Sequence, residues 1–348
     1  MSGPDDSSGR RPDAGGEAAQ QAVAPTRVGG SVDGLPRAVR IREVGPRDGF
    51  QNEPETIPTE RKIELIDALA RTGLRRIEVT SFVRPEVIPQ LADAREVLAG
   101  IDVPAFVSVS VLIPNERGLD NALALRDSLA AAAAPGARKA FDEVNVFLSA
   151  SETHNRKNVN RSIAESLAGL EAVLARAREA ELRCEGVIST SFGCPYEGHV
   201  PPARVLQIAT RLRQAGAEEI AFGDTTGMAN PNQVREFFRS ARDCLGEGVE
   251  LTAHFHNTRG QGLANVLAAL EAGVASFESS FGELGGCPVP AGATGNIATE
   301  DLVSMLHEMD VHTGIDLPAL IECARRVQRV LGRPLGSHTL VAGPIEWG

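Results

Sequence analysis

The sequence predicts a closed (β/α)8 TIM barrel, an α/β fold in which eight parallel strands alternate with helices. Three observations lead to this prediction. From residue 39 onward, short apolar segments alternate with longer segments whose apolar residues recur at helical spacing. Eight such units follow one another at intervals of roughly 25 to 40 residues. No Gly-rich dinucleotide fingerprint follows the first strand, which argues against an open doubly wound sheet, the alternative arrangement.

The first expected strand alternates apolar and charged side chains from Val39 to Val44, and Gly45-Pro46 then breaks it. A helical pattern follows over residues 61–69, where Ile63, Ile66 and Leu69 share one face. Repeating this reading along the chain places strands at residues 39–45, 75–82, 105–112, 143–149, 184–190, 218–223, 250–256 and 275–281.

The two ends of the chain depart from the repeated unit. Residues 1–36 are rich in Gly, Ala, Ser, Asp and Pro and lack apolar periodicity, so we predict a disordered tail. The barrel domain is expected at 37–310, and a C-terminal helical extension at 311–348. Helical patterns at 299–309 and 317–331 are expected to pack on the barrel or against a second subunit, in a homodimer or a higher homo-oligomer.

Composition excludes several classes of protein. The net charge of −11 argues against a nucleic-acid surface, which needs a basic stripe. The five cysteines form no CxxC pair, which argues against a zinc knuckle or a disulfide framework and favours a reducing compartment. No segment has the roughly 20 uninterrupted apolar residues of a membrane helix. The acidic N-terminal region does not resemble a presequence, so we expect a cytoplasmic protein.

Chemically useful side chains gather where the expected strands end. Active sites of such barrels lie at the C-terminal ends of the strands. The polar residues at these ends are Arg47, Asp48, Gln51 and Asn52 after the first strand, Glu78 in the second, Asp224 after the sixth, His254 and His256 in the seventh, and Asn296 beyond the eighth.

A metal site is the first hypothesis for this set. His254 and His256 are two residues apart on a strand, so both imidazoles leave the same face. Asp48 supplies an anionic oxygen from the first strand, and Asn296 can add a neutral oxygen. Nitrogen and oxygen ligands without a thiolate favour Mg²⁺ or Mn²⁺ over structural zinc. The alternative is one core histidine and one surface histidine.

Arg47 and Cys287 are the expected reactive groups. Arg47 stays protonated, and its fork can hold an enolate or carboxylate oxygen, although an ordinary surface ion pair with Asp48 is the alternative. Cys287 lies in a loop with five glycines and two prolines, residues 282–296. A cysteine in such a loop at the catalytic end is a candidate for proton transfer, whereas a buried, inert cysteine is the alternative.

Together these segments resemble the 3-hydroxy-3-methylglutaryl-CoA lyase family, over residues 39 to about 316. The Arg-Asp-Gly and His-x-His elements also occur in isopropylmalate, homocitrate and citramalate synthases. The Gly-Gly-Cys-Pro loop and the Cys-Pro-Tyr-Glu-Gly segment are features of the lyases. The matching segments are Val44–Gly49, Gln51–Glu53, Thr80–Val83, Gly193–Gly198, Gly223–Thr225, His254–His256, Gly285–Pro288 and Gly295-Asn296.

The resemblance implies a retro-Claisen cleavage that yields acetyl-CoA and a 3-keto acid such as acetoacetate. It implies that Arg47 polarises the thioester carbonyl and that Cys287 relays a proton from a loop that closes over the substrate. Glu78 would act in the site by hydrogen bonding, and Asp224 near the substrate in proton handling. The implied ligands of the divalent cation are Asp48, His254, His256 and Asn296.

An acyl-CoA substrate also needs partners for its phosphates and for its acyl group. The basic segment Arg156-Lys157-Asn158, expected as a loop after the fourth strand, is a candidate for the phosphates, with a solvated loop as the alternative. Gln51 is a further candidate contact. The metal and cation set matches the family while the expected acyl pocket differs, so we expect the same reaction and leave a longer 3-hydroxyacyl-CoA or citramalyl-CoA open as substrates.

Several positions differ from the lyase pattern. Glu185-Gly186-Val187 replaces Arg-Gly-Tyr, and Asn257-Thr258-Arg259-Gly260 replaces Asp-Thr-Tyr-Gly. Single changes are Ala221 for Ser, Glu278 for Asp and Pro290 after Val289. Two other classes of function remain as alternatives: a condensing synthase of the isopropylmalate or citramalate type, and a non-catalytic barrel that binds acyl-CoA or metal. The short C-terminus and Cys287 argue against the synthase.

Overall fold

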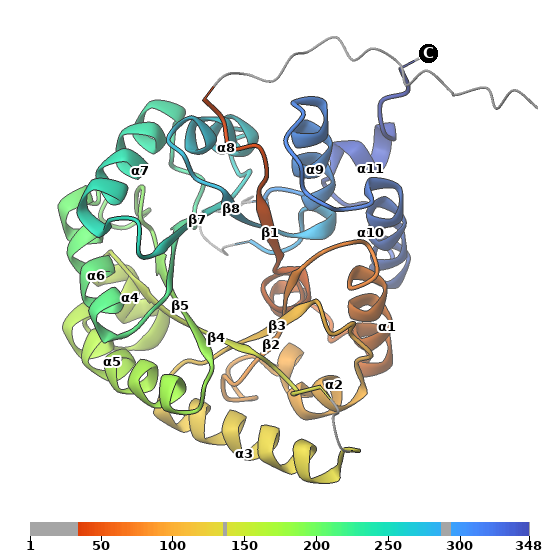
Figure 1. Cartoon of the computed structure of the whole chain (residues 1–348), viewed down its shortest axis with the longest axis horizontal. Coiled ribbons are helices and arrows are strands. Elements are labelled where there is room, and N and C mark those ends of the chain that lie inside the picture. Colours follow the sequence, from red (N-terminus) through yellow and green to blue (C-terminus); the bar gives the residue numbers. More distant parts are fainter. Residues whose placement is uncertain (1–33, 135–137, 287–293, 348) are drawn as a thin grey trace, which may run out of the picture.

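A computed structural model describes residues 34–134, 138–286 and 294–347 of the chain. Within them, eight parallel strands follow one another in sequence order around a closed barrel. Figure 1 shows the helices as a ring around these strands. The predicted (β/α)8 barrel is therefore confirmed. Residues 1–33 of the tail expected at 1–36 lie outside the described residues.

Every expected strand is present, and each end lies within three residues of its expected position. The strands are β1 (Arg40–Glu43), β2 (Arg76–Ser81), β3 (Ser108–Leu112), β4 (Glu143–Ser149), β5 (Arg183–Ser189), β6 (Glu219–Asp224), β7 (Glu250–Phe255) and β8 (Ser276–Ser279). The helices are α1 (Thr59–Leu69), α2 (Ala94–Gly100), α3 (Glu116–Ala132), α4 (Glu152–Val159), α5 (Ile163–Glu179), α6 (Pro202–Ala215), α7 (Pro231–Leu245), α8 (Gly262–Glu271), α9 (Thr299–Glu308), α10 (Leu317–Leu331) and α11 (His338–Ala342).

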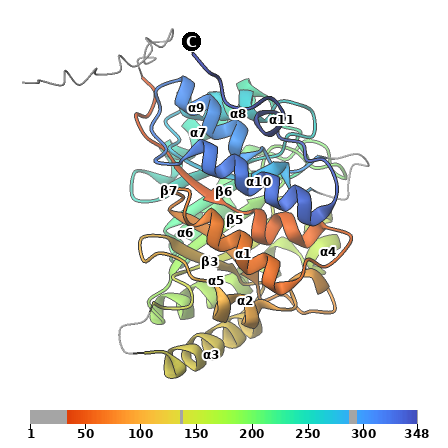
Figure 2. The same ribbon diagram turned by 90° about the vertical axis from the view of Figure 1, so that its right-hand side faces the viewer.

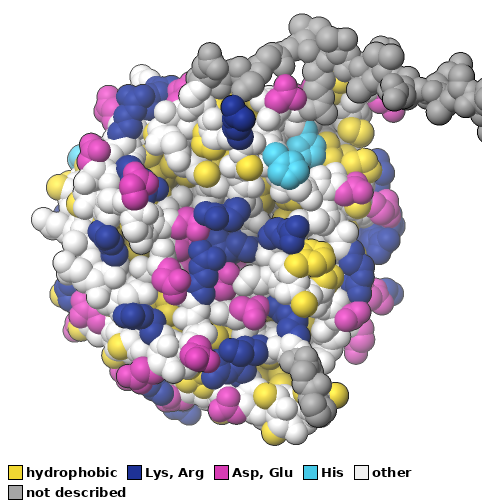
Figure 3. All heavy atoms as spheres, viewed as in Figure 1, with side chains coloured by type: hydrophobic (Ala, Val, Ile, Leu, Met, Phe, Trp, Pro, Cys, Tyr) yellow, Lys and Arg dark blue, Asp and Glu magenta, His cyan; other side chains and the backbone are white. Residues whose placement is uncertain are grey.

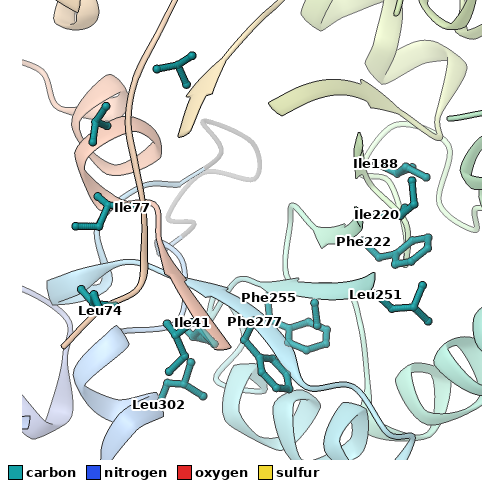
Figure 4. Close-up of a cluster of buried hydrophobic side chains, with 14 of the residues drawn as sticks. Ile41, Leu74, Ile77, Ile188, Ile220, Phe222, Leu251, Phe255, Phe277 and Leu302 are labelled. Carbon is teal, nitrogen blue, oxygen red and sulfur yellow. The ribbon is translucent and has the colours of Figure 1, made fainter. Parts of the chain in front are cut away.

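The apolar core lies between the strands and the surrounding helices. Strand side chains alternate between the two faces of the barrel wall, and the outward set is apolar. Figure 4 shows part of this apolar core, with Ile41 of β1 beside Leu302 of α9. On β6, the ring of Phe222 packs against Phe237 and Phe238 of α7, with centroids 4.9 and 5.7 Å apart. Burial of such large rings stabilises the outer layer, at about 25 cal/mol per Å² of apolar surface.

The inner face of the barrel is charged in its N-terminal half, unlike the branched apolar interior usual in this fold. The Arg42 guanidinium donates to Glu143 and Glu278, both at 2.9 Å, and also to Glu185. The Arg76 guanidinium donates to Glu143 at 2.8 Å. We call the buried set Arg42, Arg76, Glu143, Glu185, Glu219 and Glu278 the Arg42 cluster. Figure 3 shows basic and acidic side chains side by side at the centre of the face it displays.

The C-terminal helices complete the outer layer. α10 packs against α1 and α9, and Figure 2 shows it lying alongside α1. Asp316 caps α10, since its carboxylate accepts from the Ala319 amide at 3.0 Å. The pattern at 317–331 thus forms a helix that packs on the barrel, as expected, while α11 was not expected. In the described segments, none of the helices combines the length and the apolar composition that crossing a bilayer requires.

Candidate active site

Arg47 and Asp48 lie in a five-residue helical turn of π type, Gly45–Gly49, at the C-terminal end of β1. The sequence predicted that the strand breaks at Gly45-Pro46, but not the form of the turn. The Val44 carbonyl accepts from the Asp48 amide at 2.7 Å and from the Arg47 amide at 3.1 Å. Glycine is required at position 45, because a Cβ there would lie 2.5 Å from the Phe281 ring. This turn directs both charged side chains into the barrel mouth.

Two carboxylates hold the Arg47 side chain. Its Nε donates to Glu78 Oε2 at 2.7 Å, and its Nη1 donates to Asp48 Oδ1 at 2.8 Å. Glu78 is buried, and its Oε1 accepts from Asn145 Nδ2 at 3.1 Å. Burial acts to lower the pKa of Arg47, but Glu78 and Asp48 outweigh burial and raise it. Arg47 is therefore a fixed, permanently charged cation.

Four residues expected to bind a metal converge beside Arg47. Candidate ligand atoms of Asp48, His254 and His256 all lie within 4.8 Å of one another. The Nε2 atoms of His254 and His256 are 3.1 Å apart. Asn296 joins them, since its Nδ2 donates to Asp48 Oδ2 at 2.7 Å. The pairing of β1 with β8 and of β8 with β7 brings these distant segments together.

Two of these groups, His256 and Asp48, have the protonation state that a divalent cation requires. Burial, followed by the charge of His254, lowers the pKa of His256 to about 3, so this imidazole is neutral. Burial acts to raise the pKa of Asp48, but Arg47 and the histidines outweigh it, and the pKa is lowered. The buried Oδ1 of Asn296 has no hydrogen-bond partner among the described residues. One carboxylate, two imidazoles and a free amide oxygen fit Mg²⁺ or Mn²⁺.

A cavity of about 240 Å³ opens next to these groups at the C-terminal ends of the strands. On one side it is lined by Arg47, Asp48, Gln51, His254 and His256. Gln51 is held in place because its Nε2 donates to Asp48 Oδ1 at 3.0 Å. Apolar side chains form the rest of the wall: Val83, Ile88, Leu112, Phe147 and Val187. The cavity thus combines an ionic face with an apolar one.

Asp224 lies just outside this cavity, although its neighbours Gly223 and Thr225 line it. Its Oδ1 accepts from the Met228 amide at 2.7 Å and from the Ala229 amide at 3.1 Å. Its buried Oδ2 has no partner in the described part of the chain. Burial raises the pKa of Asp224 to about 7, which suits a group that takes up and releases a proton near neutral pH.

Two positions that differ from the lyase pattern lie near β6. Ala221 is buried on β6 and does not line the cavity. Arg259 donates through Nη1 to the carbonyls of Thr226 and Gly227, at 2.7 and 2.8 Å. Arg259 therefore braces the turn that follows β6.

The basic segment after β4 is part of helix α4 rather than a loop. Arg156 is exposed and pairs with Glu152 at 2.8 Å, away from the cavity. The Lys157 ammonium lies 4.8 Å from the centre of the Tyr196 ring and lines an adjoining cavity of about 340 Å³. Asn158 lines both cavities.

Sequence reasoning missed several residues that shape the site. His154 lines the cavity one helical turn before the predicted Asn158, and it was missed because the segment was expected to be a loop. Asn145 holds Glu78, and Glu278 holds His254, contacts that depend on strand register. Cys287 lies outside the described residues.

Comparison with known proteins gives consistent results. The family model described as HMGL-like matches residues 38–327. A hydroxymethylglutaryl-CoA lyase of Bacillus subtilis is 46% identical over 305 residues, which is 88% of this chain and 97% of that protein. The crystal structure of the B. subtilis HMG-CoA lyase superposes with a TM-score of 0.82 at 45% identity, covering 88% of this chain and 98% of that one. An HMG-CoA lyase of A. baumannii, solved with coenzyme A and 3-methylmalate, has a TM-score of 0.81 at 40% identity. The match covers 88% of this chain and 96% of that one.

Proposed function

We infer the function from the premise that the chain belongs to the HMGL-like family and is a carbon–carbon lyase. We propose that it cleaves 3-hydroxy-3-methylglutaryl-CoA to acetyl-CoA and acetoacetate and needs a divalent cation. The observation that carries the proposal is the convergence of Asp48, His254, His256 and Asn296 beside the guanidinium of Arg47. Such a site can grip hydroxyl and carboxylate oxygens and, next to them, stabilise an enolate.

Asp48, His254, His256 and Asn296 would hold the cation. When bound, Mg²⁺ or Mn²⁺ polarises the oxygens of the substrate and keeps them in place. The ionic face of the cavity then orients the hydroxyl group on C3, while the apolar wall receives the methyl group.

The reaction begins when a base removes the proton of the C3 hydroxyl, and Asp224, with a pKa raised by burial to about 7, is suited to this step. The C2–C3 bond breaks, C3 becomes the ketone of acetoacetate, and the electron pair stays on C2 as the enolate of acetyl-CoA. Arg47, held by Glu78, stabilises the enolate oxygen. Protonation of C2 completes the reaction, and we assign this proton to Cys287 on the resemblance to the lyases.

Coenzyme A would enter along α4. Lys157 and Asn158 line the cavity that adjoins the active site, and their polar groups are suited to contact the CoA arm. Arg156 is exposed on the same helix and can reach a phosphate from the surface. The A. baumannii relative was solved with coenzyme A, which supports an acyl-CoA substrate for this chain.

Metal removal tests the proposed function. Purified protein given 3-hydroxy-3-methylglutaryl-CoA should release acetyl-CoA in Mg²⁺ or Mn²⁺, lose roughly 100-fold or more of this activity in EDTA, and regain it when the cation is restored, since the cation supplies several kcal/mol of charge stabilisation. Preformed Mg–EDTA is the control for the chelator itself. Undiminished cleavage in EDTA, or no acetyl-CoA with either cation, contradicts the proposal. Free CoA released from acetyl-CoA and a 2-keto acid would indicate a condensing synthase.

A second candidate substrate carries a larger group on C3, or is citramalyl-CoA. Five apolar side chains line the cavity, and Val187 stands where the lyase pattern has tyrosine. A Pseudomonas aeruginosa relative, 41% identical over 308 residues, is named 3-hydroxy-3-isohexenylglutaryl-CoA/hydroxymethylglutaryl-CoA lyase. These observations favour a cavity that accepts more than a methyl group.

A substrate panel tests the second candidate. If the apolar wall binds the C3 substituent, kcat/KM should rise about fourfold per added methylene, since burial of one is worth about 0.8 kcal/mol. Val187→Tyr should remove this gain and spare the methyl substrate. Ala221→Ser, at a buried position that does not line the cavity, is the matched control. A kcat/KM that falls with every added carbon in the wild type rules the idea out.

A further inference from the structure

We propose that Glu278 is a positioning residue for the metal ligand His254, and that Arg42 holds Glu278 in place. The inference rests on the cation site of the proposed function. It concerns β8 and the barrel interior, which contribute no direct ligand to that site in the proposed scheme.

Glu278 bridges the active site and the Arg42 cluster with its two oxygens. Oε2 lies 2.8 Å from Nδ1 of His254, and Oε1 accepts from Arg42 Nη1 at 2.9 Å. All three side chains are buried, and β7 and β8 pair with His254 opposite Glu278. The carboxylate therefore has one geometry in which both of its contacts are made.

This contact selects the form of His254 that binds a cation. A carboxylate next to Nδ1 accepts the proton of that atom, so the lone pair of the neutral ring resides on Nε2. Nε2 is the atom that faces His256, at 3.1 Å, and the position shared with Asp48. Without Glu278, the proton is free to occupy Nε2, and the ring is free to turn.

The cluster also fixes the charge of Glu278. Arg42 donates to Glu185 as well, and Glu185 and Glu278 are both positions at which the sequence departs from the lyase pattern. The two departures thus meet on one guanidinium.

The experiment is a titration of metal-free protein with Mn²⁺. Binding is measured by calorimetry or by electron paramagnetic resonance of the free ion. Glu278→Ala should weaken Mn²⁺ binding by about 10- to 100-fold, the usual effect of losing such a partner. Glu278→Gln, which keeps an acceptor but no charge, should weaken it less. Glu278→Asp should restore part of the loss. Glu143→Gln is the matched control, because Glu143 binds Arg42 and Arg76 but contacts no proposed ligand.

Melting temperatures of all variants show whether each one folds. Mn²⁺ affinity unchanged in Glu278→Ala, or lowered equally in Glu143→Gln, overturns the inference. The outcome is separable from that of the proposed function: a wild type that binds Mn²⁺ but does not cleave the thioester leaves the role of Glu278 intact, whereas a wild type that binds no Mn²⁺ refutes the cation site itself and this inference with it.

Discussion

Replacing Arg47 with glutamine is expected to lower kcat for 3-hydroxy-3-methylglutaryl-CoA by about a thousandfold while Mn²⁺ binding persists. The enolate oxygen carries its negative charge only as the carbon–carbon bond breaks, so loss of the guanidinium affects kcat more than KM. Glutamine keeps a hydrogen-bond donor but no charge, and it leaves Glu78 buried without its main partner. Acetyl-CoA release and Mn²⁺ titration on the same preparation measure both quantities.

Two comparisons make the Arg47 result specific. Arg47→Lys keeps the charge but not the fork that bonds to Glu78 and Asp48, so its activity should lie between those of the wild type and the glutamine variant. Arg61→Gln removes an exposed arginine that pairs with Glu64 on α1 and should leave kcat unchanged. A kcat of Arg47→Gln within tenfold of the wild type would show that another group stabilises the enolate.

Replacing Asp48 with asparagine is expected to weaken Mn²⁺ binding by about 100-fold or more and to abolish cleavage at ordinary Mn²⁺ concentrations. Asp48 is the only carboxylate of the proposed ligand set, because the other members are two imidazoles and an amide. A hard cation loses most when the charged oxygen is removed. Part of the activity should return at high Mn²⁺ concentration, which occupies the weakened site by mass action.

Glu78→Gln is the matched comparison for Asp48→Asn. Both carboxylates bond to Arg47, but only Asp48 belongs to the proposed ligand set. Glu78→Gln should therefore lower kcat and leave Mn²⁺ affinity nearly unchanged. If Asp48→Asn binds Mn²⁺ as tightly as the wild type, the cation is held by other groups.

The strands and most of the helices were predictable because their signals are local. The pattern at 317–331 became a helix with the same ends, and the strand at 143–149 has the expected bounds. Alternation in a strand and periodicity in a helix depend only on residues that are close in sequence. Eight strand–helix units in succession are compatible with few folds. The turn at Gly45–Gly49 was not predicted in form, and the close approach of Phe281, which leaves no room for a Cβ at position 45, involves a residue far away in sequence.

The convergence of Asp48, His254, His256 and Asn296 could be expected once the barrel was assumed, because strand ends of a barrel meet at one mouth. The side chains that hold these four residues in place could not be predicted. The bond from Glu278 to His254 depends on the register of β7 against β8. The apolar wall draws on several strands and loops, and no single segment of the sequence indicates it.

The predicted contacts for the CoA phosphates were hard to assign because the segment that carries them is a helix. Arg156, Lys157 and Asn158 are adjacent in sequence, but on a helix they point in different directions. Only Asn158 lines the cavity next to the proposed metal ligands, while Arg156 pairs with Glu152 on the surface. Periodicity over so short and polar a segment gives little warning that it is helical.

The charges inside the barrel bear on how the strands find their alignment during folding. Arg183 and Glu185 both face inward on β5, as Arg40 and Arg42 do on β1. A two-residue slip of β5 that moved Arg183 to the position of Glu185 would keep the apolar residues outward yet place an arginine opposite Arg42. Hydrophobic patterning alone tolerates such an error, whereas two buried like charges do not. The interior charges therefore penalise barrels of the wrong shear, a selectivity that an aliphatic interior would lack.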